Sequence, residues 1–347
     1  MRPRPESITD QVTAREALAA RSAVWTRHWA SGAPHSCAGT YGERYTGAIA
    51  EFWRTVFGSL TGGQRVLDIA TGNGALPRLL LALQPAAPIE VDAIDLAAIE
   101  PPWIASLSAA ARGRMRFHGD QPAESLSFPD RAFDLIISQY GIEYSDLDCS
   151  ITEMLRVLAP GGRIALLVHV VGSRPVTLAA VEIAHLDWLL SDAGLLRATA
   201  AMIEPISRAG TPDGRAALAY DRGAEVARER FNAAQLGLRE RAAVKDGADV
   251  LFEMQTALAA ALGVAAQHGV AAARIRLDAI ELAARDSHLR LRQLCNHALP
   301  RSKLDALCQA LLQAPGASRS VTTGEVHEQG FLMGCTLLAH TTASQQA

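Results

Sequence analysis

The chain has 347 residues, of which 49% are apolar and 20% are charged, and its formal net charge is −3. This apolar content is enough for one large domain or two smaller ones, and the weak negative charge argues against electrostatic binding of nucleic acid. Five cysteines are scattered without Cys-x-x-Cys spacing, no signal-peptide core opens the chain, and no apolar run approaches the roughly 20 residues that span a bilayer. A soluble, cytoplasmic protein with free thiols and no membrane partner is expected.

The first 60 residues predict two helices, over 8–30 and 44–60, joined by a loop rich in small residues. Aromatic residues are concentrated here, although they make up only 5% of the chain. Trp25 and Trp29 are four residues apart and therefore share one face of the first helix. The simplest interpretation is that these rings hold the N-terminal segment against the core of the protein.

The stretch Arg65–Ala75 predicts a buried strand, a tight glycine turn and the start of a helix. Gly72 and Gly74 allow a sharp turn and let a ligand approach the main chain without meeting a Cβ. A dinucleotide-binding turn would need a third glycine, and Pro77 stands in its place. Asp68 would repel a pyrophosphate but would hold a cationic amino group. An amino-acid-bearing nucleoside therefore fits this turn better than a dinucleotide.

A second strand, over 89–95, ends in Asp95. This acid lies about 20 residues beyond Gly74, which is the offset at which a carboxylate accepts hydrogen bonds from ribose hydroxyls. Strands and helices then alternate, which implies a mostly parallel sheet with helices on both faces. The further strand-forming runs lie within 117–121, 128–144 and 155–169.

These ordered motifs, between about residues 64 and 170, resemble those of class I S-adenosylmethionine-dependent methyltransferases. The resemblance implies an α/β fold with a doubly wound, seven-stranded, mostly parallel, Rossmann-like sheet, N-terminal helices and a large helical insertion. It also implies S-adenosyl-L-methionine as the cofactor. Ala70 stands where many members of the family carry glycine, which is a departure from the pattern in the turn.

The resemblance assigns cofactor-binding roles to residues at the strand ends. The glycine turn with Asp68 would hold the methionine part, and Asp95 would bind the ribose. The loop after the third strand would bracket the adenine, and the end of the fourth strand would line the methionine tail and the acceptor pocket. The implied set is Asp68, Ala70, Thr71, Gly72, Asn73, Gly74, Asp95, Leu96, Asp120, Gln121, Ser138, Gln139 and Tyr140.

Residues 173–316 have helical periodicity throughout, as at Leu251, Met254 and Leu258. The tail returns to strand-forming composition, and in the methyltransferase fold the last two strands are an antiparallel pair. An insertion that leaves the carboxyl edge of the sheet would roof the acceptor pocket, although its apolar face fits the surface of a homodimer equally well. The expected divisions are an N-terminal helical cap (1–60), a cofactor-binding core (61–172), a helical insertion (173–316) and the final strands (317–347).

Methyl transfer from a sulfonium is an in-line displacement, in which a protein contributes mainly alignment and exclusion of water. A hydroxyl acceptor also needs a base. His169, at the end of the fifth strand, is the candidate because imidazole titrates near neutral pH, and the alternative is a structural histidine bonded to the backbone. Tyr140 and Glu143 follow the fourth strand, where they would orient or deprotonate an acceptor. Glu143 would otherwise pair with an arginine of the insertion.

The N-terminal aromatic residues have a second interpretation within this family. A sulfonium cation favours aromatic faces, so the segment would act as a flap over the reacting centre. No His-x-x-x-His or clustered Asp/His spacing indicates a cation site, and no metal is expected. The predicted substrate-binding residues are Trp25, Trp29, His35, Tyr41 and Tyr144.

The motif after the fourth strand excludes some classes of methyl acceptor. Residues 138–141 lack the Asn/Asp-Pro-Pro-aromatic sequence of enzymes that methylate amino groups of bases, and no paired glutamates indicate methylation of protein arginines. A small, fairly apolar organic molecule, methylated on O, N or C, is the best remaining interpretation. Two alternatives stay open: a regulatory protein that only binds the cofactor, and an enzyme that uses it in non-methylating chemistry such as hydroxylation or cyclisation.

Overall fold

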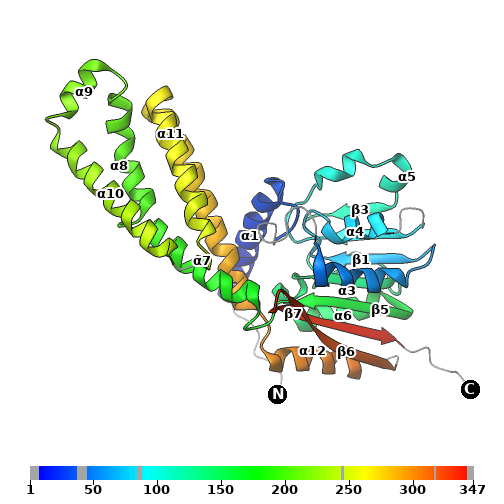
Figure 1. Cartoon of the computed structure of the whole chain (residues 1–347). Helices are drawn as coiled ribbons and strands as arrows, with labels where there is room; N and C mark the ends of the chain where they lie inside the picture. The colour runs from blue at the N-terminus through cyan, green and yellow to red at the C-terminus, as the bar shows by residue number, and fades with distance from the viewer. Residues whose placement is uncertain (1–7, 37–44, 84–87, 244–245, 316–317, 342–347) are drawn as a thin grey trace, which may run out of the picture. The chain divides into compact units, whose positions relative to one another are not determined.

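The structure, a computed structural model, describes residues 8–36, 45–83, 88–243, 246–315 and 318–341, with the backbone alone for 8–17 (Figure 1). Its contacts divide the chain into two compact units. The core unit consists of Met1–Val176 together with His297–Ala347, and the helical unit is Thr177–Asn296. Each unit has its own hydrophobic core.

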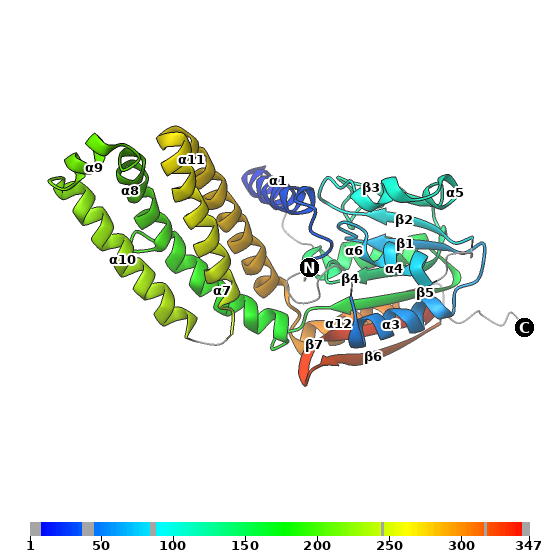
Figure 2. The ribbon, with the colours of Figure 1, turned by 45° about the horizontal axis from the view of Figure 1, so that its top comes forward.

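The core unit contains a sheet of seven strands in the order β3-β2-β1-β4-β5-β7-β6 (Figures 1 and 2). The first five strands are parallel, and β7 runs antiparallel to both β5 and β6. Short apolar runs form these strands because both faces of a parallel sheet are buried. The predicted doubly wound, mostly parallel fold with a final antiparallel pair is confirmed. The strands are β1 Arg65–Ile69, β2 Glu90–Ile94, β3 Met115–His118, β4 Phe133–Gln139, β5 Leu158–Val168, β6 Arg319–Glu328 and β7 Phe331–Thr341.

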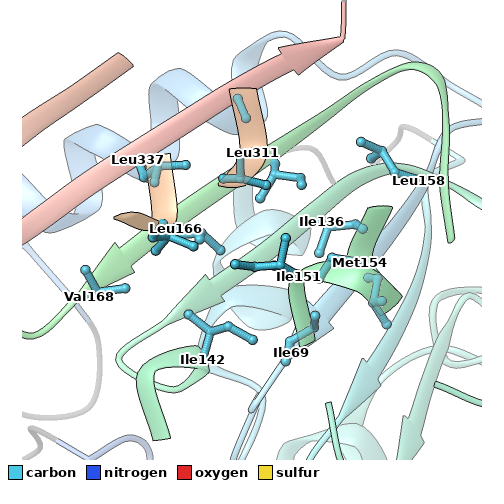
Figure 3. Close-up of a cluster of buried hydrophobic side chains, with 14 of the residues drawn as sticks. Ile69, Ile136, Ile142, Ile151, Met154, Leu158, Leu166, Val168, Leu311 and Leu337 are labelled. Atoms are coloured by element: carbon cyan, nitrogen blue, oxygen red, sulfur yellow. The ribbon is translucent and has the colours of Figure 1, made fainter. Parts of the chain in front are cut away.

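Helices cover both faces of this sheet. On one face of the sheet, Trp53 of α3 packs against residues of β1. On the opposite face, Met154 of α6 and Leu311 of α12 pack on β4 and β5 (Figure 3). Burial of each such side chain contributes about 1.5–3 kcal/mol. The helices of the core unit are α1 Ile8–Ala30, α3 Gly47–Gly58, α4 Ala75–Leu83, α5 Ala109–Arg112, α6 Leu147–Val157 and α12 Arg301–Gln313, with 3-10 helices η1 Pro102–Ser106 and η2 Ile142–Tyr144.

The last helix before the final strands differs from its predicted place. The sequence assigns residues up to 316 to the helical insertion, but α12 belongs to the core unit. Leu304, Leu307 and Leu311 form its buried face, which packs in the same cluster as β5 and β7. Apolar spacing identifies such a helix but does not identify the surface that it covers, so the insertion is shorter than predicted.

The helical unit is built from the greater part of α7 and from the helices that follow it up to Asn296. Its core includes Leu186, Leu196, Leu238, Leu258 and Leu277, one from each long helical segment. The helices are α7 Arg174–Leu190, α8 Leu195–Arg208, α9 Pro212–Leu218, α10 Arg222–Ala242 and α11 Asp249–His297, the last of which extends into the core unit.

Helix α11 is interrupted at Gly269, where φ is 81° and the backbone is not helical. By length and composition it is able to cross a membrane, since an 18-residue window reaches a mean hydropathy of 1.3. A single helix of this kind is weak evidence for a membrane-spanning segment, because the core helices of soluble proteins pass the same test.

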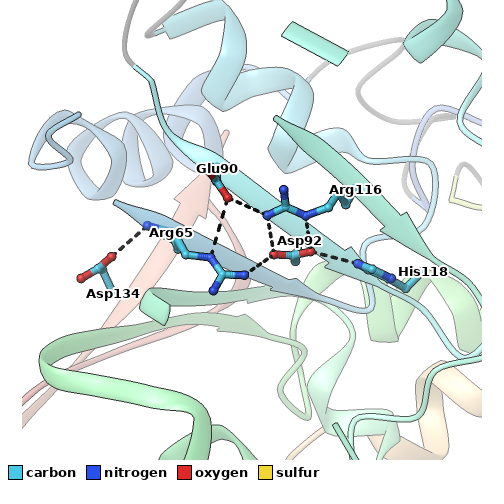
Figure 4. Close-up of polar contacts among 6 residues, drawn as sticks. All are labelled: Arg65, Glu90, Asp92, Arg116, His118 and Asp134. Carbon is cyan, nitrogen blue, oxygen red and sulfur yellow. Dashed lines mark hydrogen bonds and ion pairs between the residues drawn. The ribbon is translucent and has the colours of Figure 1, made fainter. Parts of the chain in front are cut away.

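An ionic cluster around the buried Asp92 joins β1, β2 and β3 in the core unit (Figure 4). Asp92 is 2% exposed and accepts hydrogen bonds from Arg116 at 2.8 Å, Arg65 at 3.0 Å and His118 at 3.0 Å. Burial alone would raise the pKa of Asp92, but these hydrogen bonds outweigh that effect and lower the pKa to about 2. The negative charge of the Asp92 carboxylate is compensated by basic side chains of the fold, so its role is structural.

Candidate functional site

A cavity opens at the carboxyl ends of β1, β2 and β4, the edge at which open α/β sheets bind ligands. It holds about 930 Å³ of space, including the part open to solvent. Of the residues implied as cofactor ligands, those that line it are Asp68, Ala70, Thr71, Asp95, Leu96, Gln121, Gln139 and Tyr140. The sequence therefore brings most of the implied set to one place.

The glycine turn after β1 forms one wall of this site. Gly72 has φ of 55°, and a Cβ there would lie 2.6 Å from the ring of Trp29. Gly74 has φ of 76°, and its Cβ would lie 2.8 Å from the ring of Phe117. Both positions therefore require glycine, for backbone conformation and for space. Ala70 also lies in the left-handed region, with φ of 58°, and so retains the conformation of the glycine that it replaces.

Two buried carboxylates lie beside the turn. Asp68 is 1% exposed and accepts a hydrogen bond from the Thr71 hydroxyl at 2.6 Å. Asp95 accepts the backbone N–H groups of Gly72 at 2.8 Å and Ala97 at 2.9 Å. Among the described residues neither carboxylate forms an ion pair with a basic side chain, which distinguishes them from Asp92.

Burial raises the pKa of Asp68 to about 8, because the Thr71 hydrogen bond only partly offsets it and the charge of Asp95 adds to it. Burial also raises the pKa of Asp95 to about 6, against the two backbone hydrogen bonds. A cationic ligand would stabilise the charged form of both groups. The acidic hydrogen-bond acceptors of this wall fit a ligand with an ammonium group, a sulfonium and ribose hydroxyls, as S-adenosylmethionine has.

Side chains of helix α1 form another wall of the cavity. Asn73 donates from Nδ2 to the carbonyls of Trp29 at 2.9 Å and Ala33 at 2.8 Å, and Ser22 donates to the Leu96 carbonyl at 3.1 Å. The segment is thus bonded to the turns that follow β1 and β2. Of the predicted substrate-binding residues, those that line the cavity are Trp25, Trp29, His35 and Tyr144.

The N-terminal aromatic residues pack against one another and line the cavity, while their role as a flap over the reacting centre stays a prediction. Trp25 and Trp29 stack with ring centroids 5.6 Å apart, and His35 stacks on Tyr45 at 4.1 Å. Trp25 also meets Tyr144 edge to face at 6.1 Å, so this ring packs on the end of the fourth strand's loop while it lines the cavity. Tyr41, which the sequence also assigns to the substrate, lies outside the described residues.

The predicted catalytic residues are brought together, but only one of them lines the cavity. Tyr140 does so, with φ of 54° and its hydroxyl donating to the Met333 carbonyl at 3.1 Å. Glu143 and His169 are each 2% exposed and lie 2.9 Å apart, from Oε1 to Nδ1. The Tyr140 ring stacks on the imidazole at 4.0 Å, so it stands on the cavity side of this pair.

The remaining implied residues do not line the cavity, and all of them except Asp120 support its walls. The Ser138 hydroxyl donates to the Ile69 carbonyl at 2.8 Å and accepts from the Ile142 N–H at 3.1 Å, which ties the end of β4 to β1. Asp120 is exposed, in a turn with φ of 54°. Gly72, Asn73 and Gly74 shape the turn itself, as their contacts with α1 and β3 show.

The lining residues that were not predicted include Arg21, Tyr45 and Glu124. Arg21 has a usable sequence signal, because it precedes Trp25 and Trp29 at helical spacing on the same face of α1. Its Nη1 donates to the Tyr144 carbonyl at 2.7 Å. Burial lowers the pKa of Arg21, and the nearby Glu124 counteracts this. No local pattern marks Glu124, since its place in the site depends on the loop after β3.

Comparison with known proteins agrees with this geometry. The sequence profile of a family described as "Methyltransferase domain" matches residues 66–162, from β1 into β5. A demethylmenaquinone methyltransferase of Thermus thermophilus is 42% identical over 108 residues, which are 30% of this chain and 46% of that protein. Residues 66–162 therefore match a methyltransferase domain, as the resemblance of the ordered motifs predicts.

Other relatives of this methyltransferase domain match over similar lengths. The ubiquinone/menaquinone biosynthesis C-methyltransferase UbiE of Stutzerimonas stutzeri is 32% identical over 141 residues, 38% of this chain and 55% of that protein. A solved structure of the YcgJ protein from Bacillus subtilis has 29% identity and a TM-score of 0.30, and covers 39% of this chain and 58% of that chain. The chain spans about half the length of the curated relatives that it matches.

Proposed function

We propose that this protein transfers a methyl group from S-adenosylmethionine to a small, fairly apolar organic acceptor, on oxygen, nitrogen or carbon. The observation that carries the proposal is the composition of the cavity wall. Two buried carboxylates without a cationic partner among the described side chains lie beside a glycine turn, and aromatic rings from α1 line the same space. An acidic surface suits the cofactor, and an aromatic one suits an apolar acceptor.

The bound cofactor supplies a methyl group activated on a sulfonium. Within the cavity, Asp68 would bind the amino group, Asp95 the ribose hydroxyls and Gln121 the adenine. Asp95 also holds the N–H groups of Gly72 and Ala97, so the same carboxylate shapes the turn and meets the ligand. The aromatic side chains exclude water and present faces that favour a cation.

One named relative is a demethylmenaquinone methyltransferase, and the other is a C-methyltransferase of ubiquinone/menaquinone biosynthesis. This supports an acceptor with an electron-rich ring, such as a phenol or a quinol. The aromatic lining of the cavity suits such a ring, because Trp25 and Tyr144 meet edge to face and expose apolar surface. Membrane, nucleic acid and a second subunit are not required by this reaction.

The test is transfer of isotopically labelled methyl to a panel of quinols, phenols and amines, with detection of both the methylated product and S-adenosylhomocysteine. Label in an acceptor supports the proposal. Calorimetric binding of the cofactor without transfer to any member of the panel would favour a regulatory protein. Conversion of an acceptor without transfer of label would favour non-methylating chemistry.

The role of His169 as a base belongs to this proposal and stays a prediction. His169→Asn is expected to lower turnover while cofactor affinity changes less than about twofold, because the imidazole does not line the cavity. A base would act past the Tyr140 ring, and its loss would remove the acid limb of the pH–rate profile. Reduced turnover with an unchanged profile would instead identify a positioning residue.

A further inference from the structure

A second cavity of the core unit lies beside the glycine turn, outside the cofactor cavity. It holds about 1020 Å³ of space, including the part open to solvent, which accommodates a small organic molecule. The two cavities adjoin, since Tyr45 and Ala75 line both. Asp68 and Asp95, which make the cofactor cavity acidic, do not line the second one. The two spaces therefore differ in the charge of the ligand that they favour.

Most of the second cavity's surface is apolar. One wall is a face of α4, where Ala75, Leu79 and Ala82 recur at helical spacing. Pro34 adds its ring from the N-terminal segment, and Trp103 adds its ring from η1. Ring surfaces and aliphatic side chains of this kind suit a planar, apolar ligand.

Arg78 is the basic group of this lining. It lies next to Leu79 on α4 and is half-buried. Its guanidinium forms no ion pair with any described residue, and no acidic residue of the described chain lines the cavity. A guanidinium pairs with a carboxylate through two parallel hydrogen bonds. An organic acid would therefore supply the missing counter-charge.

Asn73 gives the cavity a buried hydrogen-bond acceptor. The residue is 4% exposed, and its Nδ2 donates to the carbonyls of Trp29 and Ala33. A flipped amide would place oxygen against both of these oxygens, so the orientation of the side chain is fixed. Its Oδ1 is buried and has no partner among the described residues. A ligand hydroxyl would remove the cost of this unpaired acceptor.

Asn73 also connects the second cavity with the cofactor site. Its two Nδ2 hydrogen bonds attach the N-terminal segment to the glycine turn, and its backbone carbonyl accepts from the Trp103 indole at 2.7 Å. A donor to Oδ1 would polarise the amide and strengthen both Nδ2 bonds, because linked hydrogen bonds reinforce one another. Occupancy of the second cavity would thus stabilise a wall of the first.

We propose that the second cavity binds a small aromatic acid that also carries a hydroxyl group, and that its occupancy strengthens cofactor binding. The carboxylate pairs with Arg78, and the hydroxyl donates to Asn73. This ligand is an effector rather than the methyl acceptor. The binding site does not depend on the proposed methyl transfer, whereas the coupling rests on cofactor binding in the first cavity.

The test uses para-hydroxyphenylacetate as the probe, measured by calorimetry with and without saturating S-adenosylhomocysteine. The probe is expected to bind in both conditions. Its methyl ester lacks the charge, and phenylacetate lacks the hydroxyl, so each is expected to bind about fivefold more weakly. Saturating probe is expected to tighten binding of S-adenosylhomocysteine about threefold, and the reverse titration is expected to give the same factor.

Three variants locate the site. Arg78→Gln is expected to weaken the probe about fivefold, to the level of the ester, and to leave the ester unchanged. Arg112→Gln, at an exposed arginine of α5 outside the cavity, is the matched control and is expected to change neither. Ala82→Phe adds a ring to the lining and is expected to abolish probe binding, with a change of less than about twofold in S-adenosylhomocysteine affinity. Thermal unfolding confirms that each variant is folded.

Several outcomes would overturn the inference. Competition between the probe and S-adenosylhomocysteine would place the probe in the cofactor cavity. Equal weakening of probe and ester by Arg78→Gln would show that the guanidinium does not recognise the carboxylate. Binding without any change in cofactor affinity would refute the coupling, and absence of binding would refute the site. Failure of S-adenosylhomocysteine alone to bind, with the probe still bound, would instead refute the proposed function and keep the second site.

Discussion

Three carboxylates are buried on neighbouring strands of the core unit, and they differ in what surrounds them. Asp68, Asp92 and Asp95 are 1%, 2% and 8% exposed, so burial does not separate them. Asp92 meets two guanidinium groups and has a pKa of about 2. Among the described residues Asp68 and Asp95 meet only neutral donors, and their pKa values are about 8 and 6.

The charge of the surrounding groups distinguishes a structural acid from acids that a ligand would complete. At Asp92 the compensating charge comes from the chain, and the fold is complete without any ligand. At Asp68 and Asp95 the compensating charge is missing from the described side chains, and a cationic nucleoside would supply it. Strongly raised pKa values that arise from burial within a cavity are typical of functional sites.

Loss of Asp92 is expected to have the largest effect. Asp92→Ala leaves Arg65 and Arg116 without their main acceptor and is expected to lower the free energy of unfolding by about 2–4 kcal/mol. Cofactor affinity per folded molecule is expected to stay unchanged. Denaturant unfolding and calorimetry measure the two quantities.

Glu90 provides the matched control for this substitution. It also pairs with Arg116, at 2.8 Å, but its side chain is 47% exposed. Glu90→Ala is therefore expected to cost less than about 1 kcal/mol. Equal effects of the two substitutions would contradict the view that burial makes the Asp92 cluster structurally important.

Substitution of Asp95, unlike that of Asp92, is expected to lower cofactor affinity more than stability. Asp95→Ala is expected to weaken cofactor binding by roughly 1–3 kcal/mol through loss of the ribose hydrogen bonds. Asp95→Asn keeps one acceptor for the N–H groups of Gly72 and Ala97, and a smaller loss is expected. Calorimetric titration measures both, and unchanged affinity in Asp95→Ala would remove Asp95 from the site.

These contrasts show what the sequence predicts and why. The glycine turn, the strand-end acids and the order of the strands follow from local patterns, and the structure bears out the fold and collects Asp68 and Asp95 in one cavity. The structural role of Asp92 depends instead on arginines that are 27 and 24 residues away in the chain. No spacing rule connects them before the strands are paired.

Two further features depend on tertiary packing in the same way. The position of His169 at the end of β5 follows from the sequence, but the Tyr140 ring that separates it from the cavity depends on how two strand ends pack. Helix α12 has the apolar spacing of the insertion, yet it covers the sheet. In each case a one-dimensional pattern identifies an element and its buried face, while the partner of that face is a tertiary property.

The pH dependence of stability sharpens the comparison. A carboxyl with a raised pKa in the folded state stabilises the protein below its unfolded pKa, near 4, and this contribution is lost as the pH rises through the folded value. Asp95 and Asp68 therefore favour the unliganded fold at low pH and lose that contribution through about pH 6 and about pH 8. Asp92, with its lowered pKa, stabilises above pH 4 and loses its contribution as the pH falls towards about 2.

Thermal unfolding of the unliganded protein between pH 5 and pH 8.5 tests this opposition. Asp68→Asn is expected to reduce the loss of stability with rising pH, by less than about 1.4 kcal/mol for each pH unit. Cofactor binding is expected to release protons near pH 7, because the ammonium group favours ionised Asp68. A steeper loss of stability in Asp68→Asn, or binding without proton release, would contradict the raised pKa.

Removal of the helical unit is expected to have the smallest effect on either acid site, because all of their contacts lie within the core unit. The chain leaves and re-enters the core at neighbouring points, since Val170 pairs with Leu299. A Gly/Ser linker of about ten residues, roughly 17 Å on average, can therefore replace Thr177–Asn296. Cofactor affinity is expected to change less than about twofold.

Turnover of the shortened protein then tests the prediction that the helical insertion covers the acceptor. If it does, methyl transfer is expected to fall strongly while calorimetric binding of S-adenosylhomocysteine persists, because alignment and exclusion of water are lost but the acidic wall is kept. Full turnover would show that the core unit alone holds the acceptor. Loss of cofactor binding in a folded core would contradict the assignment of the cofactor site to the core unit. Asp68 and Asp95 would then depend on groups outside the unit that contains them.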